Sequence, residues 1–190
     1  MKRSAETRIL LIALTALVMD QITKWAVVRS IGTGLDDAIP VIEGIFQLVH
    51  LGNTGAAWSM LQGNAGILAV FSVAALVLLW VFRKHFEADT PVGQAALGLI
   101  LGGVAGNMID RVLRQHVVDF LYFYIGFWFP AFNLADSAIC CGVGLMFLQS
   151  FRNREAGTLD PDRIRKRVLE AGKTSLEENA GEDDARGRDQ

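Results

Sequence analysis

Four apolar stretches constrain this chain more than any other feature of its sequence. Each is close to the roughly 20 residues that a helix needs to cross a hydrocarbon core of about 30 Å. They are residues 8–30, 66–82, 94–113 and 131–151. Hydrophobic residues make up 52% of the chain, which is too much for a soluble domain of 190 residues. The sequence therefore predicts an all-α membrane protein whose four transmembrane helices form one domain, residues 1–154.

The basic residues predict how these helices are oriented in the membrane. They lie before the first stretch, after the second and after the fourth: Lys2, Arg3, Arg8, Arg83, Lys84, Arg152 and Arg154. Because lysine and arginine favour the cytoplasmic side, both termini are expected in the cytoplasm. Residues 31–65 contain no lysine or arginine and are expected outside. Asp20 and Lys24 interrupt the first stretch, which has no small-residue cleavage site, so it is interpreted as a retained span.

The segments outside the apolar stretches predict three smaller features. AIPVIEGIFQLVHL (38–51) partly alternates β-branched and aromatic residues, which predicts a small extracytoplasmic β element. FLYFYIGFWFPAF (120–132) carries eight aromatic side chains, so this loop is expected at the membrane interface. Residues 155–190 are charged and small, which predicts a cytoplasmic tail with a short helix followed by disorder.

Small residues within the stretches predict helix packing. Gly98, Gly102 and Gly106 recur every four residues and would form a groove on one face of the third helix, against which a neighbour can pack closely. Cys140 and Cys141 are adjacent in an apolar stretch without nearby metal-ligand partners. They are therefore interpreted as small packing residues.

Polar side chains inside the apolar stretches point to a functional site. Inserting a charged side chain near the bilayer centre costs about 2.5 to 3.5 kcal/mol of free energy. Each such residue is therefore expected to have a polar partner or a functional role. The polar residues in the stretches are Asp20, Lys24, Asn107, Asp110, Arg111, Asn133 and Asp136. The predicted orientation brings them into one layer near the outer leaflet, and Asp119 and Asn53 in the flanking loops join it. We expect a water-accessible polar pocket there, enclosed by protein.

The acids of this layer differ in their neighbours. Asp20 and Lys24 are four residues apart and could form a structural ion pair, and Asp110 is expected to brace the pocket. Asp119 and Asp136 have no obvious basic partner. Two such acids brought together in a site of low dielectric constant would share one proton and could activate water.

Other chemistries have little support in the sequence. It contains neither an HExxH zinc motif nor a GxSxG nucleophile motif, so no metal or other cofactor is expected. No basic patch predicts nucleic-acid binding. On these residues alone, a transporter that uses Asp119 and Asp136 as proton or cation ligands stays open, although no inverted repeat is detectable. A non-catalytic membrane scaffold also stays open, but it leaves the clustered acids unexplained.

Five short motifs narrow these alternatives. They are DQITKW from Asp20, NTGAAW from Asn53, GNMIDR from Gly106, VVDF from Val117 and FNLAD from Phe132. Together, and in this order, they resemble the bacterial lipoprotein signal peptidase family, signal peptidase II. The resemblance implies a four-span aspartyl endopeptidase of the bacterial inner membrane with its active site at the outer leaflet. Its expected partners are membrane lipid and diacylglyceryl-modified prolipoproteins, which it would cut immediately before the lipidated cysteine.

The resemblance also implies a role for each polar residue. The catalytic pair would be Asp119 of VVDF and Asp136 of FNLAD. The residues expected to bind substrate are Asn53, Asn107, Arg111 and Asn133. Asp20, Lys24 and Asp110 are expected to support the pocket.

Overall fold

The computed structural model describes residues 2–55, 61–86, 88–158, 165 and 169. The chain divides into two units after Phe147, and every contact discussed below lies within the first, Met1–Phe147. Most of the predicted tail, residues 155–190, lies outside the described residues.

Four long helices account for most of the described chain. They are α1 (Lys2–Ser30), α2 (Ala65–Val81), α3 (Pro91–Arg114) and α4 (Leu134–Thr158), and a short 3-10 helix, η2 (Arg83–Phe86), follows α2. Their bounds follow the four predicted stretches, although α1 begins earlier and α4 continues further than predicted. Three of the helices contain segments long and apolar enough to cross a membrane: Ser4–Ser30, Pro91–Arg114 and Leu134–Arg152. α2 is also apolar but has only 17 residues.

α3 is the central helix, and glycines let its neighbours approach closely. A Cβ atom added to Gly98 would lie 2.8 Å from the Cβ of Ile12 on α1, and one added to Gly102 would collide with the Ala13 carbonyl oxygen. A Cβ on Gly103 would collide with the carbonyl oxygen of Ala135 on α4. Glycines therefore bring α3 into backbone contact with two helices, and the predicted packing groove on α3 is confirmed.

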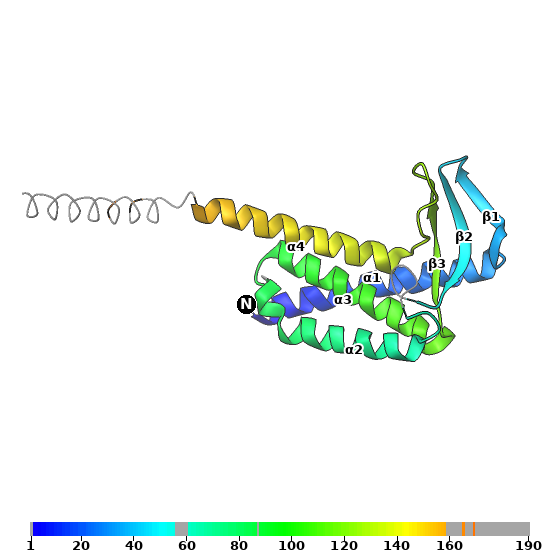
Figure 1. The fold of residues 1–190 in the computed structure, drawn as a ribbon. Coiled ribbons are helices and arrows are strands. Elements are labelled where there is room, and N and C mark those ends of the chain that lie inside the picture. Colours follow the sequence, from blue (N-terminus) through cyan, green and yellow to red (C-terminus); the bar gives the residue numbers. More distant parts are fainter. Residues whose placement is uncertain (1, 56–60, 87, 159–164, 166–168, 170–190) are drawn as a thin grey trace, which may run out of the picture. The chain divides into compact units, whose positions relative to one another are not determined.

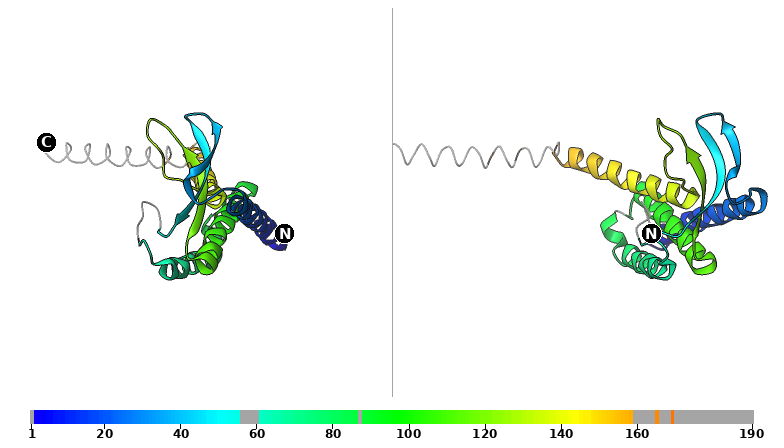
Figure 2. Two further views of the ribbon diagram at one scale, coloured as in Figure 1. Left: turned by 90° about the vertical axis from the view of Figure 1, so that its right-hand side faces the viewer. Right: turned by 45° about the vertical axis from the view of Figure 1, so that its right-hand side comes forward.

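A three-stranded antiparallel sheet lies at the end of the helices away from the N-terminus (Figure 1). It consists of β1 (Gly34–Ile42), β2 (Phe46–Asn53) and β3 (Val117–Phe123), in the order β1-β2-β3. Figure 2 shows this sheet from two other directions. β1 and β2 confirm the predicted β element, whereas β3 was not predicted as a strand. β3 forms because it pairs with β2, which lies more than sixty residues earlier in the chain.

The first half of β3 packs against the C-terminal end of α1. Val118 is fully buried and Phe120 is 6% exposed, and both belong to an apolar cluster with Val27 and Ile31. At the other end of β3, Phe123 stacks on Phe46 with their ring centroids 4.3 Å apart. This packing fixes the position of β3, and therefore of Asp119 on it, relative to α1.

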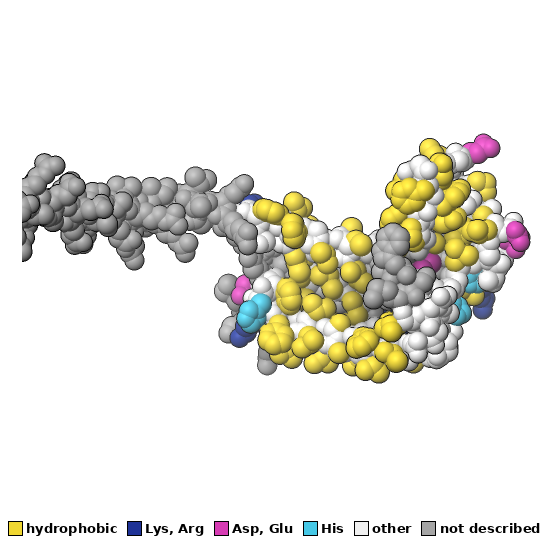
Figure 3. Space-filling model, viewed as in Figure 1, with side chains coloured by type: hydrophobic (Ala, Val, Ile, Leu, Met, Phe, Trp, Pro, Cys, Tyr) yellow, Lys and Arg dark blue, Asp and Glu magenta, His cyan; other side chains and the backbone are white. Residues whose placement is uncertain are grey.

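Apolar side chains cover much of the outer surface of the helices. Figure 3 shows hydrophobic side chains over most of the helical part of the face in view. Large exposed side chains occur on each long helix, for example Leu14, Phe71, Leu113 and Val143. A surface this apolar would favour aggregation in water and is typical of a protein that contacts lipid.

We expect Gly102→Ala to destabilise the fold, because the added methyl group has no space beside the backbone of α1. Overpacking of this kind costs about 1 to 3 kcal/mol. Gly144→Ala is the matched control, since nothing lies within 4 Å of a Cβ atom there. Thermal melting of the detergent-purified variants should show a lower midpoint for Gly102→Ala alone. Equal midpoints would contradict this account of the α1–α3 contact.

Candidate active site

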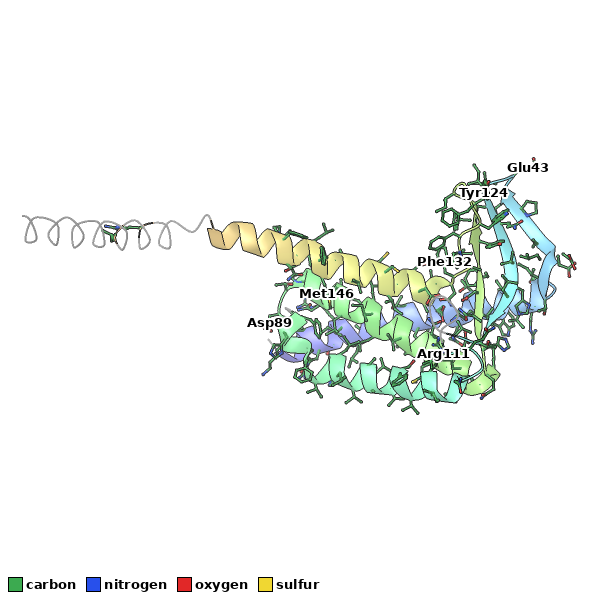
Figure 4. The ribbon with its side chains drawn as sticks, in the orientation of Figure 1. Glu43, Asp89, Arg111, Tyr124, Phe132 and Met146 are labelled. Carbon is green, nitrogen blue, oxygen red and sulfur yellow. The ribbon has the colours of Figure 1, made fainter. Side chains whose placement is uncertain are left out.

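A cavity of about 670 Å³ lies beside the sheet, where α3 ends and α4 begins. The predicted polar residues Asn53, Asn107, Arg111, Asp119 and Asp136 all line it. The cavity is therefore lined by residues of β2, α3, β3 and α4. In Figure 4, Arg111 and Phe132, both lining residues, lie at this end of the helices, whereas Asp89 and Met146 lie at the opposite end.

Asp119 lies on β3 and is 3% exposed. Its Oδ1 accepts a hydrogen bond from Asn133 Nδ2 at 2.7 Å, and its Oδ2 accepts one from Asn53 Nδ2 at 3.0 Å. Burial and, secondarily, the neighbouring Asp136 raise the pKa of Asp119 to about 7, against the opposing effect of the two amide bonds. Near neutral pH this acid can therefore hold or release a proton.

Asp136 lies in the first turn of α4, where it takes part in a capping box. The backbone N–H of Asp136 donates to Asn133 Oδ1 at 2.9 Å, and the backbone N–H of Asn133 donates to Asp136 Oδ2 at 3.3 Å. The reciprocal bonds satisfy two amides that a helix start leaves unpaired. The helix dipole also favours a negative charge at this end. The local sequence NLAD thus has a structural reason to carry an acid here.

Two asparagine side chains connect the two acids. Asn107 Nδ2 donates to Asp136 Oδ1 at 2.7 Å, and Asn107 Oδ1 accepts from Asn133 Nδ2 at 3.2 Å. Asn133 Nδ2 also donates to Asp119. A continuous chain of hydrogen bonds therefore runs from Asp119 through Asn133 and Asn107 to Asp136, and it holds the two carboxyl groups in a fixed relation.

A buried cluster of charges lies behind this chain. Lys24 Nζ lies 2.9 Å from Asp20 Oδ2 and 2.8 Å from Asp110 Oδ2, and all three side chains are fully buried. Lys24 also donates to Asn107 Oδ1 at 2.9 Å. The predicted Asp20–Lys24 pair is confirmed. Asp110, which precedes Arg111 in sequence, instead pairs with Lys24 and with Arg114.

The same cluster holds the backbone beside each acid. Asp20 Oδ1 accepts a hydrogen bond from the N–H of Ala135 at 2.9 Å, and Asp110 Oδ2 accepts one from the N–H of Val118 at 3.3 Å. Ala135 immediately precedes Asp136, and Val118 immediately precedes Asp119. Each carboxylate of the cluster therefore fixes the chain next to one acid of the cavity.

Arg111 contributes donors to the cavity wall. Its Nη2 donates to the carbonyl oxygen of Gly55 at 3.3 Å, and its Nη1 lies 3.4 Å from the carbonyl oxygen of Asn107. Its buried Nε has no hydrogen-bond partner among the described residues. A ligand with a carbonyl or carboxylate oxygen would find a donor here.

Two features of the site were missed from the sequence. Gln21 donates to Asp20 Oδ2 at 3.1 Å and to the Gly106 carbonyl oxygen at 3.2 Å, so it extends the charged cluster. Cys140 is exposed and lines the cavity, so the interpretation of this cysteine as a packing residue was wrong. Its spacing of four residues from Asp136 places it on the same helix face and could have revealed its position.

The helices and the cavity together define a membrane protein with two carboxylates in one cavity, a kind of site that membrane enzymes and transporters share. Comparison with known proteins resolves this choice. The model of the family described as signal peptidase (SPase) II matches residues 12–152. This chain belongs to the signal peptidase II family and is a membrane peptidase.

Individual relatives agree with this assignment. A lipoprotein signal peptidase of Bacillus pumilus is 43% identical over 141 residues, which cover 73% of this chain and 89% of the relative. One from Geobacillus kaustophilus is 39% identical and covers 74% and 90%. A solved bacterial membrane enzyme, determined by the in meso method, superposes with a TM-score of 0.70 at 32% identity and covers 77% of this chain and 88% of that chain.

We expect Lys24→Met to destabilise the protein strongly, because it leaves Asp20 and Asp110 buried without their shared cation. Breaking one side of a buried ion pair costs about 3 to 5 kcal/mol. Arg83→Met is the control, since its pair with Glu6 is partly exposed and such pairs contribute about 0 to 1 kcal/mol. Melting midpoints and folded yields in detergent should separate the two variants. A Lys24→Met protein as stable as Arg83→Met would show that the cluster does not hold the fold together.

Proposed function

We propose that this chain is an aspartic endopeptidase that removes the signal peptide from diacylglyceryl-modified prolipoproteins by cutting immediately before the lipidated cysteine. The observation that carries the proposal is that Asp119 and Asp136 line one cavity and are joined through Asn133 and Asn107. Membership of the signal peptidase II family, and relatives named lipoprotein signal peptidase, support the reaction and the substrate class.

The surroundings of the two acids suggest which is the general acid and which is the general base. Asp119 is the buried acid whose pKa is raised to about 7, so we assign the shared proton of the pair to it. Asp136 accepts hydrogen bonds from Asn107 and from the backbone of Asn133, so both of its oxygens already serve as acceptors. Asp136 is then the base and Asp119 the acid.

The reaction proceeds in two steps. Asp136 takes a proton from water as its oxygen attacks the scissile carbonyl carbon, and Asp119 gives its proton to the carbonyl oxygen, which yields a tetrahedral diol. The C–N bond then breaks as Asp136 passes its proton to the leaving nitrogen. Asp119 regains a proton from one hydroxyl group, so both acids return to their starting states.

The amides and the guanidinium around the pair are suited to hold a peptide backbone. Asn53, Asn107 and Arg111 line the cavity, and Asn133 lies directly behind it. The guanidinium of Arg111 carries N–H donors suited to a substrate carbonyl oxygen. We assign these four residues to substrate binding and Asp20, Lys24 and Asp110 to the support of the acids.

We also propose the membrane arrangement. α2, at about 1.5 Å per residue, spans roughly 25 Å and serves as the fourth transmembrane helix beside α1, α3 and α4. Both termini lie in the cytoplasm of a bacterial cell, and residues 155–190 form a tail there. The cavity then lies at the outer leaflet of the inner membrane, with the aromatic segment 120–132 at the interface. A lipidated cysteine anchored in that leaflet presents its peptide bond at this depth.

The first test of the proposal is replacement of each acid. Purified Asp119→Asn and Asp136→Asn should lose cleavage of a diacylglyceryl-modified prolipoprotein by about 100-fold or more, the range expected for a lost general acid or base. Asp36→Asn, which alters an exposed acid on β1, is the matched control and should cut like the wild type. Melting curves establish that each variant is folded.

An unmodified prolipoprotein, assayed alongside, tests the substrate class and should not be cut. If both folded acid variants still cut, Asp119 and Asp136 are structural. If wild-type protein cuts neither substrate, the proposed substrate class and cleavage site fail.

The second test is the pH profile. Since the pKa of Asp119 lies above its ordinary value, its proton is kept below about pH 7 and lost above it. We therefore expect kcat/KM to fall as the pH rises through about 7. The hydrogen bond from Asn53 lowers the pKa of Asp119, so Asn53→Ala should move this fall to higher pH, whatever it does to the maximum rate. A profile that is level across this region, or that moves to lower pH in Asn53→Ala, would refute the assignment of the proton.

A further inference from the structure

An apolar stripe on α4 begins inside the cavity and runs along the helix away from it. Ile139 and Cys140 line the cavity together with Asp136. Cys140, Val143 and Phe147 follow Asp136 by four, seven and eleven residues, so they share its face of the helix. Cys140 is exposed, and the side chains of Val143 and Phe147 are 51% and 65% exposed.

Most of the stripe does not face the neighbouring helix α3. The contacts of α4 with α3 include Ala135 and the side chain of Ile139, which both meet Gly103, and Gly142, where an added Cβ atom would lie 2.6 Å from the Ala96 carbonyl oxygen. Ile139 is therefore the edge of the stripe next to α3, whereas the line through Cys140, Val143 and Phe147 is centred more than 90° around the helix from Ala135 and Gly142, at 100° per residue. Next to the stripe, Gly144 has open space around its Cα atom. The stripe is therefore a shallow apolar track that is open on its outer side.

The proposed reaction requires a path for lipid that begins at the acids. Its leaving nitrogen belongs to the lipidated cysteine, whose Cα atom lies only about 3.8 Å from that of the preceding residue. The thioether and its acyl chains must therefore leave the cavity close to Asp136. Four residues, about 6 Å along α4, separate Asp136 from Cys140. The cavity wall at this distance is the beginning of the apolar stripe.

The rest of the cavity is less suited to acyl chains. Its lining also includes Asn53, Thr54, Gly55 and Arg111, and an apolar chain against these residues would bury polar groups without partners. Phe129 and Phe132 are apolar lining residues, but Phe132 is tied by backbone hydrogen bonds to β3, at the sheet end of the molecule. Among the described lining residues, those of α4 continue onto an exposed apolar surface of the helices.

We propose that Ile139, Cys140, Val143 and Phe147 form the track that receives the diacylglyceryl group of the substrate and sets the preference for lipidated prolipoproteins. The inference rests on the proposed function and deepens it. The thioether and the glycerol contact Ile139 and Cys140, and the acyl chains extend past Val143 to Phe147. The track recognises apolar length and makes no polar contact with the chains.

Adjacent cysteines provide a matched pair for the test. Cys141 is also exposed, but it lies about 100° around the helix from Cys140 and does not line the cavity. In Cys140→Trp the indole would occupy the start of the track, whereas Cys141→Trp places the same group on another face. For a diacylglyceryl-modified substrate, KM should rise about tenfold or more in Cys140→Trp, as expected for the loss of roughly two buried methylene contacts. Cys141→Trp should match the wild type in KM and in melting midpoint.

Alkylation keeps the inference testable if Cys140→Trp does not fold. N-ethylmaleimide adds a thiol across its double bond, with the sulfur bonded to one carbon and the proton transferred to the other. It should inactivate Cys141→Ser, which keeps Cys140, and spare Cys140→Ser, which keeps Cys141. A lipidated substrate with an uncleavable bond should protect Cys140, and the same peptide without lipid should not.

Acyl length provides an independent readout of the far end of the track. Phe147 lies about 16 Å along the helix from Asp136, so only long chains reach it. Phe147→Ala should raise KM for substrates with long acyl chains and leave KM for short-chain substrates unchanged.

The outcomes separate the two proposals. If wild-type protein cuts lipidated substrate while Cys140→Trp and Cys141→Trp behave alike, or both single-cysteine proteins are inactivated equally, the track is refuted and the proposed function stands. An equal effect of Phe147→Ala at all chain lengths would also refute it. If the wild type cuts nothing, the proposed function itself fails.

Discussion

The site depends on one buried cation. Lys24, on α1, is shared by Asp20 of the same helix and by Asp110 of α3, and these carboxylates accept hydrogen bonds from the backbone of α4 and β3. Four elements thus meet at a single ammonium group. A buried charge cluster is costly to desolvate and is weak evidence for stability by itself. The cluster does fix the positions of α4 and β3, because a shift of either element would break a hydrogen bond to a buried carboxylate.

Small residues make this convergence possible. Apolar helices gain little from contact with one another in lipid, so close packing and polar contacts must hold them together. Gly98 and Gly102 let α1 approach α3 closely, and Gly103 does the same for α4. At Gly106 an added Cβ atom would lie 2.5 Å from Asp20 Oδ2, so the row of glycines leads into the charged cluster. The close helix packing at Gly106 and the charged cluster at Asp20 are therefore in direct contact.

Much of this arrangement could be predicted from the sequence, because apolar length and misplaced charges are local signals. They gave the helices, the polar layer and the Asp20–Lys24 pair. β3 could not be predicted, since its pairing with β2 and the burial of Val118 arise only in the folded chain. The pairing of Asp110 with Lys24 could not be predicted either, because the two residues lie on different helices, whereas its pairing with Arg114, four positions on, follows helix geometry and was missed.

The two acids owe their different characters to different secondary structures. Asp119 belongs to a strand whose neighbours are buried, so its charge is disfavoured, whereas Asp136 is half-buried in the first turn of a helix and bonds to the backbone there. The helix that carries Asp136 also carries the apolar stripe. For the proposed lipidated substrate, the distance between the scissile bond and the acyl chains would then be set by the rise of one helix, about 1.5 Å per residue, and not by a loop. The proposed substrate is part peptide and part lipid, so a fixed spacing of this kind would suit it.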